Sequence, residues 1–286
     1  MSENVFVIGH KSPDLDSVTA AISYARFKNL SENTDIYKPA IAGEINRETA
    51  YALERFNIEK PDILLSADGR EVILVDHNEF AQAVDGIRSA RIKEVLDHHK
   101  VDFKYGEPIR FEIEPWGSSN TIIADKFFKS NVELNKDLAG LMLSAILVDT
   151  VITKSPTCTD KDKEIIEKLS VQAGIADWKE FGMDIFKVRS SVNELSAEEI
   201  IRSDFKDFIL KTGKFGIGQV ETHAVPRGQF FERQQPQAVA LFENFGMRRN
   251  RPQAHAVEAR IAHAPQVFLD CGQGLHHARG VVIRES

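Results

Sequence analysis

The chain has 286 residues, of which 42% are hydrophobic and 28% are charged. This is the balance of a soluble globular protein with one large domain or two ordinary ones. No apolar run approaches the roughly 18 residues of a membrane span, and the N-terminus lacks the basic region of a signal peptide. The formal net charge of −7 argues against a nucleic-acid or membrane partner, because both require a basic face. The two cysteines make no disulfide framework, so we expect a cytoplasmic protein.

Short apolar runs alternate with segments of helical spacing along the first two thirds of the chain. This alternation predicts an α/β fold with a mainly parallel sheet flanked by helices. Strands are expected at 5–9, 35–42, 71–75 and 91–96, and helices at 17–28, 46–56, 119–129, 136–146 and 160–173.

A polar break near residue 190 predicts a division of the chain into two domains. We expect a first domain at 1–188, a linker at 189–196 and a smaller, incomplete α/β domain at 197–286. The second domain would begin with a helix at 197–203 and a strand at 215–220.

Three of the predicted strands are followed by clusters that contain histidine and aspartate. The clusters are 9–17 (GHKSPDLDS), 76–79 (DHNE) and 97–99 (DHH). Ligands of open α/β sheets bind at the carboxyl ends of the strands, so the three clusters could converge on one crevice. A fourth acidic residue, Asp149, ends the apolar segment 141–148. A carboxylate in such a place is costly unless a cation compensates it.

The residue types in these clusters predict a metal site. Carboxylates and imidazoles suit Mn²⁺, Mg²⁺, Co²⁺ or Zn²⁺, and no thiolates accompany them. There are more of them than a single ion needs. Two ions about 3.5–4 Å apart, bridged by one carboxylate, would lower the pKa of a shared water and assist in-line displacement at phosphorus. The candidate ligands are His10, Asp14, Asp16, Asp76, His98 and Asp149.

Each cluster also has a purely structural explanation. The two aspartates after Pro13 could form a turn and cap the next helix. The 76–79 cluster could act as another cap, and Asp149 could pair with an arginine in the core. The segment 117–120 (GSSN) could offer amides to an anion, but we expect it to cap the following helix. The coincidence of all these clusters in one chain nevertheless favours a metal site.

The segments GHKSPDLDS (9–17), VDHNE (75–79) and LDHHK (96–100) closely resemble three motifs of the DHH phosphoesterase superfamily. Within it they resemble family II, manganese-dependent inorganic pyrophosphatases. Asp149 falls where the fourth motif of that family is expected. Ser12 is a small departure, because the family usually has Asn there.

The resemblance continues to about residue 222. SDFKDF (203–208) and FGIGQVET (215–222) resemble the start of the second domain of that family. Family members are commonly homodimers that pair through the first domain. The resemblance therefore implies a homodimer whose substrate is pyrophosphate.

The resemblance also implies roles for single residues. Pyrophosphate would be hydrolysed to two phosphates by a hydroxide that bridges two Mn²⁺ ions per subunit, with Co²⁺ or Mg²⁺ as alternative ions. Asp97 would orient an imidazole, His99 would contact the substrate phosphate, and Lys206 would reach across the domain cleft to bind pyrophosphate. The implied metal ligands are His10 and Asp14 on one ion, Asp16, His98 and Asp149 on the other, and Asp76 between the two.

The last part of the chain departs from this pattern. All 19 lysines lie at or before Lys214, and every basic residue after it is arginine. Residues 1–214 hold 28 Lys and Arg against 37 Asp and Glu, whereas 215–286 hold 8 against 6. The basic SRKKQ-type motif that completes the phosphate site of the family is missing after 222. We therefore interpret 223–286 as foreign to the fold, as a frameshifted reading frame would be, and expect manganese binding with weak turnover.

Two other functions stay open. A DHH-type phosphoesterase acting on short or cyclic nucleotides usually carries a GGGH-type stretch, whereas this chain has FGIGQVET. A catalytically dead metal-binding product would release no phosphate from any substrate. A P-loop enzyme is excluded, because its glycine-rich lysine signature does not occur in the sequence.

Overall fold

The computed structural model describes residues 4–130, 132–189, 205–210, 213–222 and 277–284. Contacts between residues divide the chain into two units, Met1–Arg189 and Ser190–Ser286, each with its own sheet. Within the described ranges, no helix is both long enough and apolar enough to cross a membrane.

The first unit is built on a six-stranded sheet whose neighbouring strands are all parallel. The strands are β1 (Val5–Ile8), β2 (Tyr37–Ile41), β3 (Asp62–Ile63), β4 (Glu71–Val75), β5 (Arg91–Asp97) and β6 (Arg110–Ile113). Their order is β3-β2-β1-β4-β5-β6, so the chain moves outward from β1 in one direction and from β4 in the other. This topology places the switch point, where α/β proteins bind ligands, at the carboxyl ends of β1 and β4.

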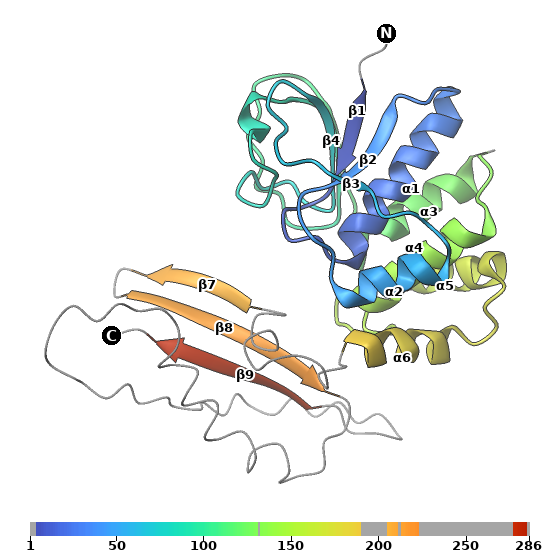
Figure 1. The fold of residues 1–286 in the computed structure, drawn as a ribbon. Coiled ribbons are helices and arrows are strands. Elements are labelled where there is room, and N and C mark those ends of the chain that lie inside the picture. Colours follow the sequence, from blue (N-terminus) through green and yellow to red (C-terminus); the bar gives the residue numbers. More distant parts are fainter. Residues whose placement is uncertain (1–3, 131, 190–204, 211–212, 223–276, 285–286) are drawn as a thin grey trace, which may run out of the picture. The chain divides into compact units, whose positions relative to one another are not determined.

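The helices of the first unit gather on one side of this sheet (Figure 1). They are α1 (Leu15–Glu32), α2 (Arg47–Arg55), α3 (Ser119–Lys129), α4 (Lys136–Asp149), α5 (Asp160–Ala173) and α6 (Trp178–Arg189). The larger core lies between them and the sheet residues Val7, Ile73 and Val75. Helix α4 is buried from Leu138 to Val148 because its sequence is apolar on every side.

Connecting segments, including a short 3-10 helix at Ile87–Ser89 between β4 and β5, cover the opposite face of the sheet in the described part of the unit. Leu74 and Ile92 pack there with Val84 and Ile87 in a second, smaller core. The sheet is therefore buried on both faces, as a parallel sheet requires.

Most of the predicted elements of the first unit are confirmed. The strand 71–75 and the helices 119–129 and 160–173 have the predicted ends, whereas α1 extends beyond both ends of the predicted helix at 17–28. Strands β3 and β6 and helix α6 are additions that the sequence analysis did not predict.

The described part of the second unit is a three-stranded antiparallel sheet. Its strands are β7 (Phe205–Leu210), β8 (Gly213–Thr222) and β9 (His277–Arg284), in that order. The predicted strand 215–220 lies within β8, and the predicted helix 197–203 lies outside the described residues. Strand β9 belongs to the compositionally divergent segment and pairs with β8 from Phe215 to Thr222. The bounds of the predicted linker stay a prediction.

Candidate metal centre

The predicted ligands come together at the carboxyl edge of the parallel sheet. His10 follows β1, Asp76 follows β4 directly, and His98 follows β5. Asp16 lies in the first turn of α1, and Asp149 is the last residue of α4. The switch point between β1 and β4 thus collects side chains from several separate segments, as the sequence predicted.

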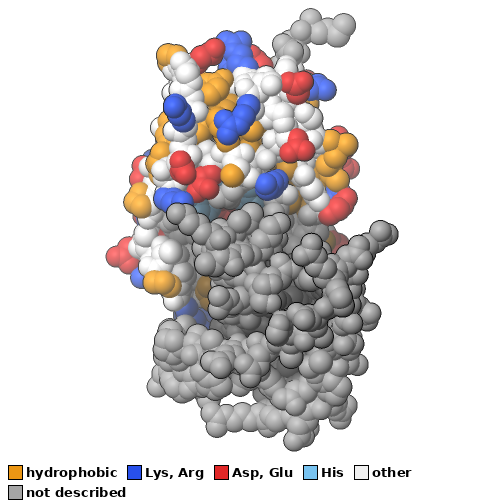
Figure 2. Space-filling model, turned by 90° about the vertical axis from the view of Figure 1, so that its left-hand side faces the viewer, with side chains coloured by type: hydrophobic (Ala, Val, Ile, Leu, Met, Phe, Trp, Pro, Cys, Tyr) orange, Lys and Arg blue, Asp and Glu red, His pale blue; other side chains and the backbone are white. Residues whose placement is uncertain are grey.

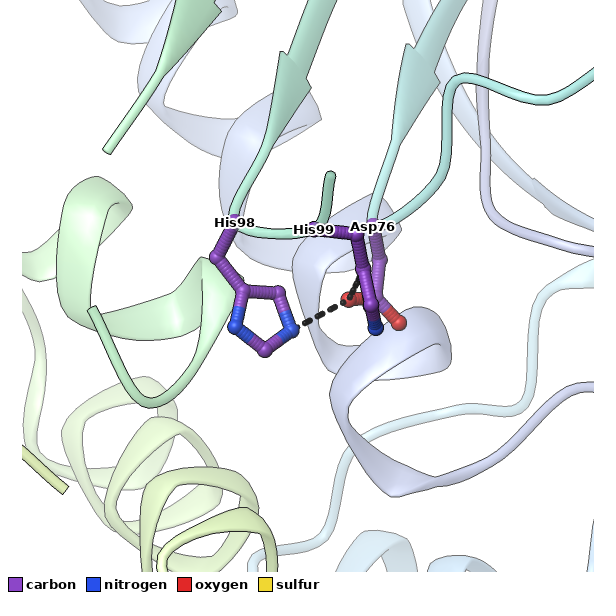
Figure 3. Close-up of side chains that lie close together, drawn as sticks. All are labelled: Asp76, His98 and His99. Atoms are coloured by element: carbon purple, nitrogen blue, oxygen red, sulfur yellow. Dashed lines mark ion pairs between the residues drawn. The ribbon is translucent and has the colours of Figure 1, made fainter. Parts of the chain in front are cut away.

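Asp76 lies at the centre of this cluster. Its Oδ2 atom is 3.4 Å from Nε2 of His10, and its Oδ1 atom is 3.4 Å from Nε2 of His98. Figure 3 shows the His98 ring pointing toward this carboxylate, with His99 beside it. The two oxygens face two different imidazoles, which is the arrangement that a carboxylate needs to bridge two cations.

Three groups of side chains in the described residues have ligand atoms that all lie within 4.8 Å of one another. The groups are His10, Asp14 and Asp76; Asp16, His98 and Asp149; and Asp76, His98 and His99. The first two groups share no residue. The site therefore offers two adjacent sets of candidate ligands rather than one.

Asp14 both caps a helix and offers an oxygen to the candidate metal site. Its Oδ1 atom caps α1 by accepting a 2.9 Å hydrogen bond from the Ser17 N–H. Its Oδ2 atom lies 3.4 Å from Nε2 of His10. The cap uses one oxygen and leaves the other facing the His10 imidazole.

The first turn of α3 directs donors at the cluster. Ser118 Oγ and Asn120 Nδ2, the latter at 2.8 Å, donate to Oδ1 of Asp16, while the Ser119 N–H donates to Oδ2 at 2.8 Å. Ser119 Oγ donates to Oδ1 of Asp76 at 3.0 Å. Ser118 also caps the helix, as predicted, by accepting from the Asn120 N–H at 3.1 Å. This segment therefore both begins the helix and orients two candidate ligands.

Both histidines that follow β5 are held through Nδ1. His98 Nδ1 lies 3.0 Å from the Trp116 carbonyl oxygen, and His99 Nδ1 lies 2.9 Å from Oδ1 of Asp97. In the neutral ring, an acceptor at Nδ1 favours the tautomer whose Nε2 is free to bind a cation. The contact between Asp97 and His99 is the one that Asp97 needs in order to orient an imidazole, its predicted role. The His99 side chain is 53% exposed, against 14% for His98, so it is the one open to a substrate.

The electrostatics of the cluster favour positive charge. Burial opposes protonation of His10, but hydrogen bonds and charge from Asp14 and Asp76 outweigh it and raise the His10 pKa to about 10. Burial is likewise outweighed at His98, whose pKa rises to about 10 beside Asp76. Burial, followed by repulsion from neighbouring carboxylates, raises the pKa of Asp149 well above its usual value. Buried carboxylates with so little solvent around them call for a cation.

The cluster opens into a pocket of about 640 Å³ that is lined by Asp14, Asp76, His98, His99 and Asp149 together with loop residues. The residues described as lining it include no lysine or arginine. On the face shown in Figure 2, the described acidic and basic side chains are interspersed and form no single-sign patch. A phosphate in this pocket would therefore depend on bound cations, on histidine or on groups from elsewhere in the chain.

Asn78, which the sequence motifs did not single out, helps to hold the site together. Asn78 is buried and donates from Nδ2 to Oδ2 of Asp97 at 2.7 Å and to the Lys100 carbonyl at 2.8 Å. Its Oδ1 accepts from the Asp102 N–H at 2.6 Å. It thus fixes the loop that carries the two adjacent histidines. The available signal was its place in the DHNE run directly after a strand.

Lys206 lies on β7, in the second unit, opposite Ile217 of β8. Its contact with substrate stays a prediction.

The sequence matches two known domain families. The DHH family, N-terminal domain, matches residues 4–146, and the DHHA2 domain matches residues 183–250. A manganese-dependent inorganic pyrophosphatase of Methanothrix thermoacetophila is 51% identical over 222 residues, which cover 77% of this chain and 71% of the relative. A protein of the same name from Methanocaldococcus jannaschii is 46% identical over 224 residues, 76% of this chain and 71% of the relative.

Comparison with solved structures points to the same family. The crystal structure of a Methanococcus jannaschii protein described as a family II inorganic pyrophosphatase has a TM-score of 0.72 and 43% identity. The match covers 84% of this chain and 78% of that one. This chain therefore belongs to the manganese-dependent, family II inorganic pyrophosphatases, with a DHH domain followed by a DHHA2 domain.

Proposed function

We propose that this chain hydrolyses inorganic pyrophosphate to two phosphates with the help of two Mn²⁺ ions. The observation that carries the proposal is the position of Asp76, whose two oxygens face His10 on one side and His98 on the other. The names of relatives that are 51% and 46% identical supply the substrate and the metal.

The donor set fits Mn²⁺. All the candidate ligand atoms are carboxylate oxygens or imidazole nitrogens, which Mn²⁺ accepts, as do Co²⁺ and, for its oxygens, Mg²⁺. Bound ions would lower the pKa of a water molecule and neutralise the charge of the phosphates. In this assignment His10 and Asp14 would hold one ion, Asp16, His98 and Asp149 would hold the other, and Asp76 would contribute to both.

Two side chains would act on the substrate itself. His99 lines the pocket, and Asp97 holds its Nδ1 and raises its pKa, so the protonated ring would donate from Nε2 to a phosphate oxygen and assist the leaving group. Lys206 would bind the substrate from the second unit. The absence of lysine and arginine from the described pocket lining supports the need for such a cation.

We further propose that the atypical C-terminal segment limits turnover. It contains no SRKKQ-type motif, and loss of one group that stabilises transition-state charge commonly lowers kcat by about 10²–10³-fold. Two observations show that part of this segment still follows the pattern of the second domain. The DHHA2 match reaches residue 250, and β9 pairs with β8. The expectation is therefore weak turnover on an intact metal site.

The test measures phosphate release from pyrophosphate by the purified chain and, in a separate chromatographic assay, cleavage of a cyclic dinucleotide to the linear dinucleotide or to mononucleotides. We expect release from pyrophosphate that stops with a chelator, returns with Mn²⁺, and is slower than that of the Methanocaldococcus jannaschii relative. Preference for the dinucleotide would establish the nucleotide phosphoesterase alternative. A chain that binds Mn²⁺ but hydrolyses neither substrate would be the inactive metal-binding product, and a rate on pyrophosphate equal to that of the relative would refute the limit on turnover.

The same resemblance leads us to propose a cytoplasmic homodimer that pairs through the first domain. Light scattering of the full chain separates a dimer from a monomer. A monomer at micromolar concentration would contradict this part of the proposal.

A further inference from the structure

Asp162, in the first turn of α5, is fully buried. Its Oδ2 accepts from the N–H and the Oγ1 of Thr159, at 2.7 and 2.6 Å, and so completes a capping box. Its Oδ1 accepts from Oγ1 of Thr121 at 2.6 Å. Both oxygens also accept from the Gly117 N–H, at 3.0 and 2.9 Å. The hydrogen bond from Gly117 joins Asp162 to a segment 45 positions earlier in the sequence, outside α5.

Gly117 lies between two residues that hold candidate metal ligands. The carbonyl oxygen of Trp116 is 3.0 Å from Nδ1 of His98. On the other side, Ser118 Oγ donates to Oδ1 of Asp16. A shift of the Gly117 peptide would move the acceptor of one ligand and the donor of the other together.

The space around Gly117 leaves the peptide little freedom. A Cβ at this position would lie 2.7 Å from Cγ2 of Thr150 and 3.0 Å from Oδ2 of Asp162. Thr150 directly follows Asp149 at the end of α4. Segments that carry or hold three of the candidate ligands therefore meet at this glycine.

We infer that Asp162 is a positioning residue of the metal centre, which fixes the Gly117 peptide and thereby orients His98 and Asp16. The inference rests on the proposed metal site. Capping of α5 alone does not account for the contact, because Thr159 and Asp162 complete the capping box without Gly117. Partners that orient a metal-binding histidine and a ligating carboxylate are a general requirement for tight binding.

The experiment compares Asp162→Asn with Thr121→Val in the full chain. The asparagine keeps the shape of the side chain but presents an NH₂ group to donors, so the bond from Gly117 is weakened. The valine removes one other donor to the same carboxylate and leaves the Gly117 contact in place. Calorimetric titration with Mn²⁺ alone should show affinity about 10–100-fold weaker for Asp162→Asn and unchanged for Thr121→Val.

A spectroscopic measurement separates positioning from general destabilisation. In the Mg²⁺-loaded, ¹⁵N-histidine-labelled protein, the Nδ1–H of His98 should give a downfield signal that is absent from His98→Gln. We expect this signal to shift or exchange away in Asp162→Asn and to stay in Thr121→Val. Loss of Mn²⁺ affinity without any change in the His98 signal would overturn the inference, as would wild-type affinity in Asp162→Asn.

If Asp162→Asn does not fold, Gly117→Ala provides the second test. It keeps Asp162 but forces the peptide away from Thr150 and the carboxylate, so the same losses of affinity and of the His98 signal are expected. A folded Gly117→Ala protein with wild-type Mn²⁺ affinity would overturn the inference. Because these readouts need no turnover, failure of the wild type to hydrolyse pyrophosphate would contradict only the proposed function.

Discussion

Asp76 has a φ of 61°, a left-handed backbone conformation that glycine adopts far more readily than other residues. For a residue with a Cβ this costs of order 1–3 kcal/mol and persists only where the surroundings hold it. Here the turn ends β4 and leaves the carboxylate between His10 and His98. The residue with the strained backbone is therefore the one proposed to bridge the two ions.

Asp76→Asn replaces one of the two facing oxygens with an NH₂ group, and asparagine tolerates the same backbone conformation. We expect the affinity for Mn²⁺, measured by calorimetry, to fall by more than the about 10–100-fold typical of an outer-shell change. Phosphate release should fall with it. Asp85→Asn, which changes an exposed carboxylate later in the same β4–β5 connection, is the matched control and should change neither. Tight Mn²⁺ binding by Asp76→Asn would contradict the bridging role.

His77 is the buried neighbour of Asp76. Its Nδ1 lies 2.9 Å from the Val75 carbonyl oxygen, and its Nε2 has no hydrogen-bond partner among the described residues. Burial lowers the pKa of His77 from 6.5 to about 4. The folded protein thus binds this proton less readily than the unfolded chain. The stability that depends on a neutral His77 is complete above pH 6.5 and is lost as the pH falls toward 4.

His77→Asn removes this titration and keeps a nitrogen near the position of Nδ1. The free energy of unfolding of the wild type should therefore fall relative to that of the variant between pH 6.5 and 4, by at most about 3 kcal/mol. Urea unfolding of both proteins in a chelator, at several pH values, measures the difference. Parallel pH profiles would show that His77 is not the group that titrates.

At the scale of elements, packing overrides local propensity at Gly140 in α4. A Cβ there would overlap the ring of Phe56, the C-cap residue of α2. Helix propensity alone predicts that Gly140→Ala stabilises the protein by about 1 kcal/mol. Crowding of a packed ring costs about 1–3 kcal/mol, so we expect a net loss of stability.

Thermal unfolding of Gly140→Ala, with and without Phe56→Leu, measures this effect. The alanine should lower the Tm in the wild-type background and raise it, or leave it unchanged, when the smaller leucine makes room. Stabilisation by Gly140→Ala in the wild-type background would show that α2 and α4 do not approach as closely as described.

The elements that could be predicted from the sequence carry strong local signals. Helix α5 begins with the capping box of Thr159 and Asp162, and β4 is a continuous apolar run. Strand β6 (RFEI) has no such signal, because its charged residues lie at the edge of the sheet and it is held by pairing with β5. Its existence depends on a partner strand that its own four residues do not encode.

In the candidate site, the ligands could be predicted from the sequence, whereas the residues that orient them could not. Each predicted ligand either lies in a polar cluster that follows an apolar run or, like Asp149, ends such a run, so it is visible in the sequence. The residues that orient the ligands do not stand out, since their role arises from contacts between distant segments. Ser118 reaches Asp16 across 102 positions, and Asp162 reaches Gly117 across 45. Only the fold brings such pairs together.

At the scale of the whole molecule, the first unit supplies the candidate metal ligands, and the second unit carries Lys206 on β7. Lys206→Gln should lower kcat/KM for pyrophosphate by about 10–100-fold, because a hydrogen bond to a charged group contributes about 1.5–3 kcal/mol. It should leave Mn²⁺ affinity unchanged. Lys214→Gln, on the neighbouring strand β8, is the control. Equal kinetics for the two variants would contradict the role of Lys206.

The binding of two ions around Asp76 is tested most directly by anomalous diffraction at the manganese edge from crystals of the full chain grown with Mn²⁺. We expect two peaks per chain about 3.5–4 Å apart, on either side of the Asp76 carboxylate, one beside His10 and the other beside His98. A single peak, or peaks that do not involve Asp76, would contradict this expectation.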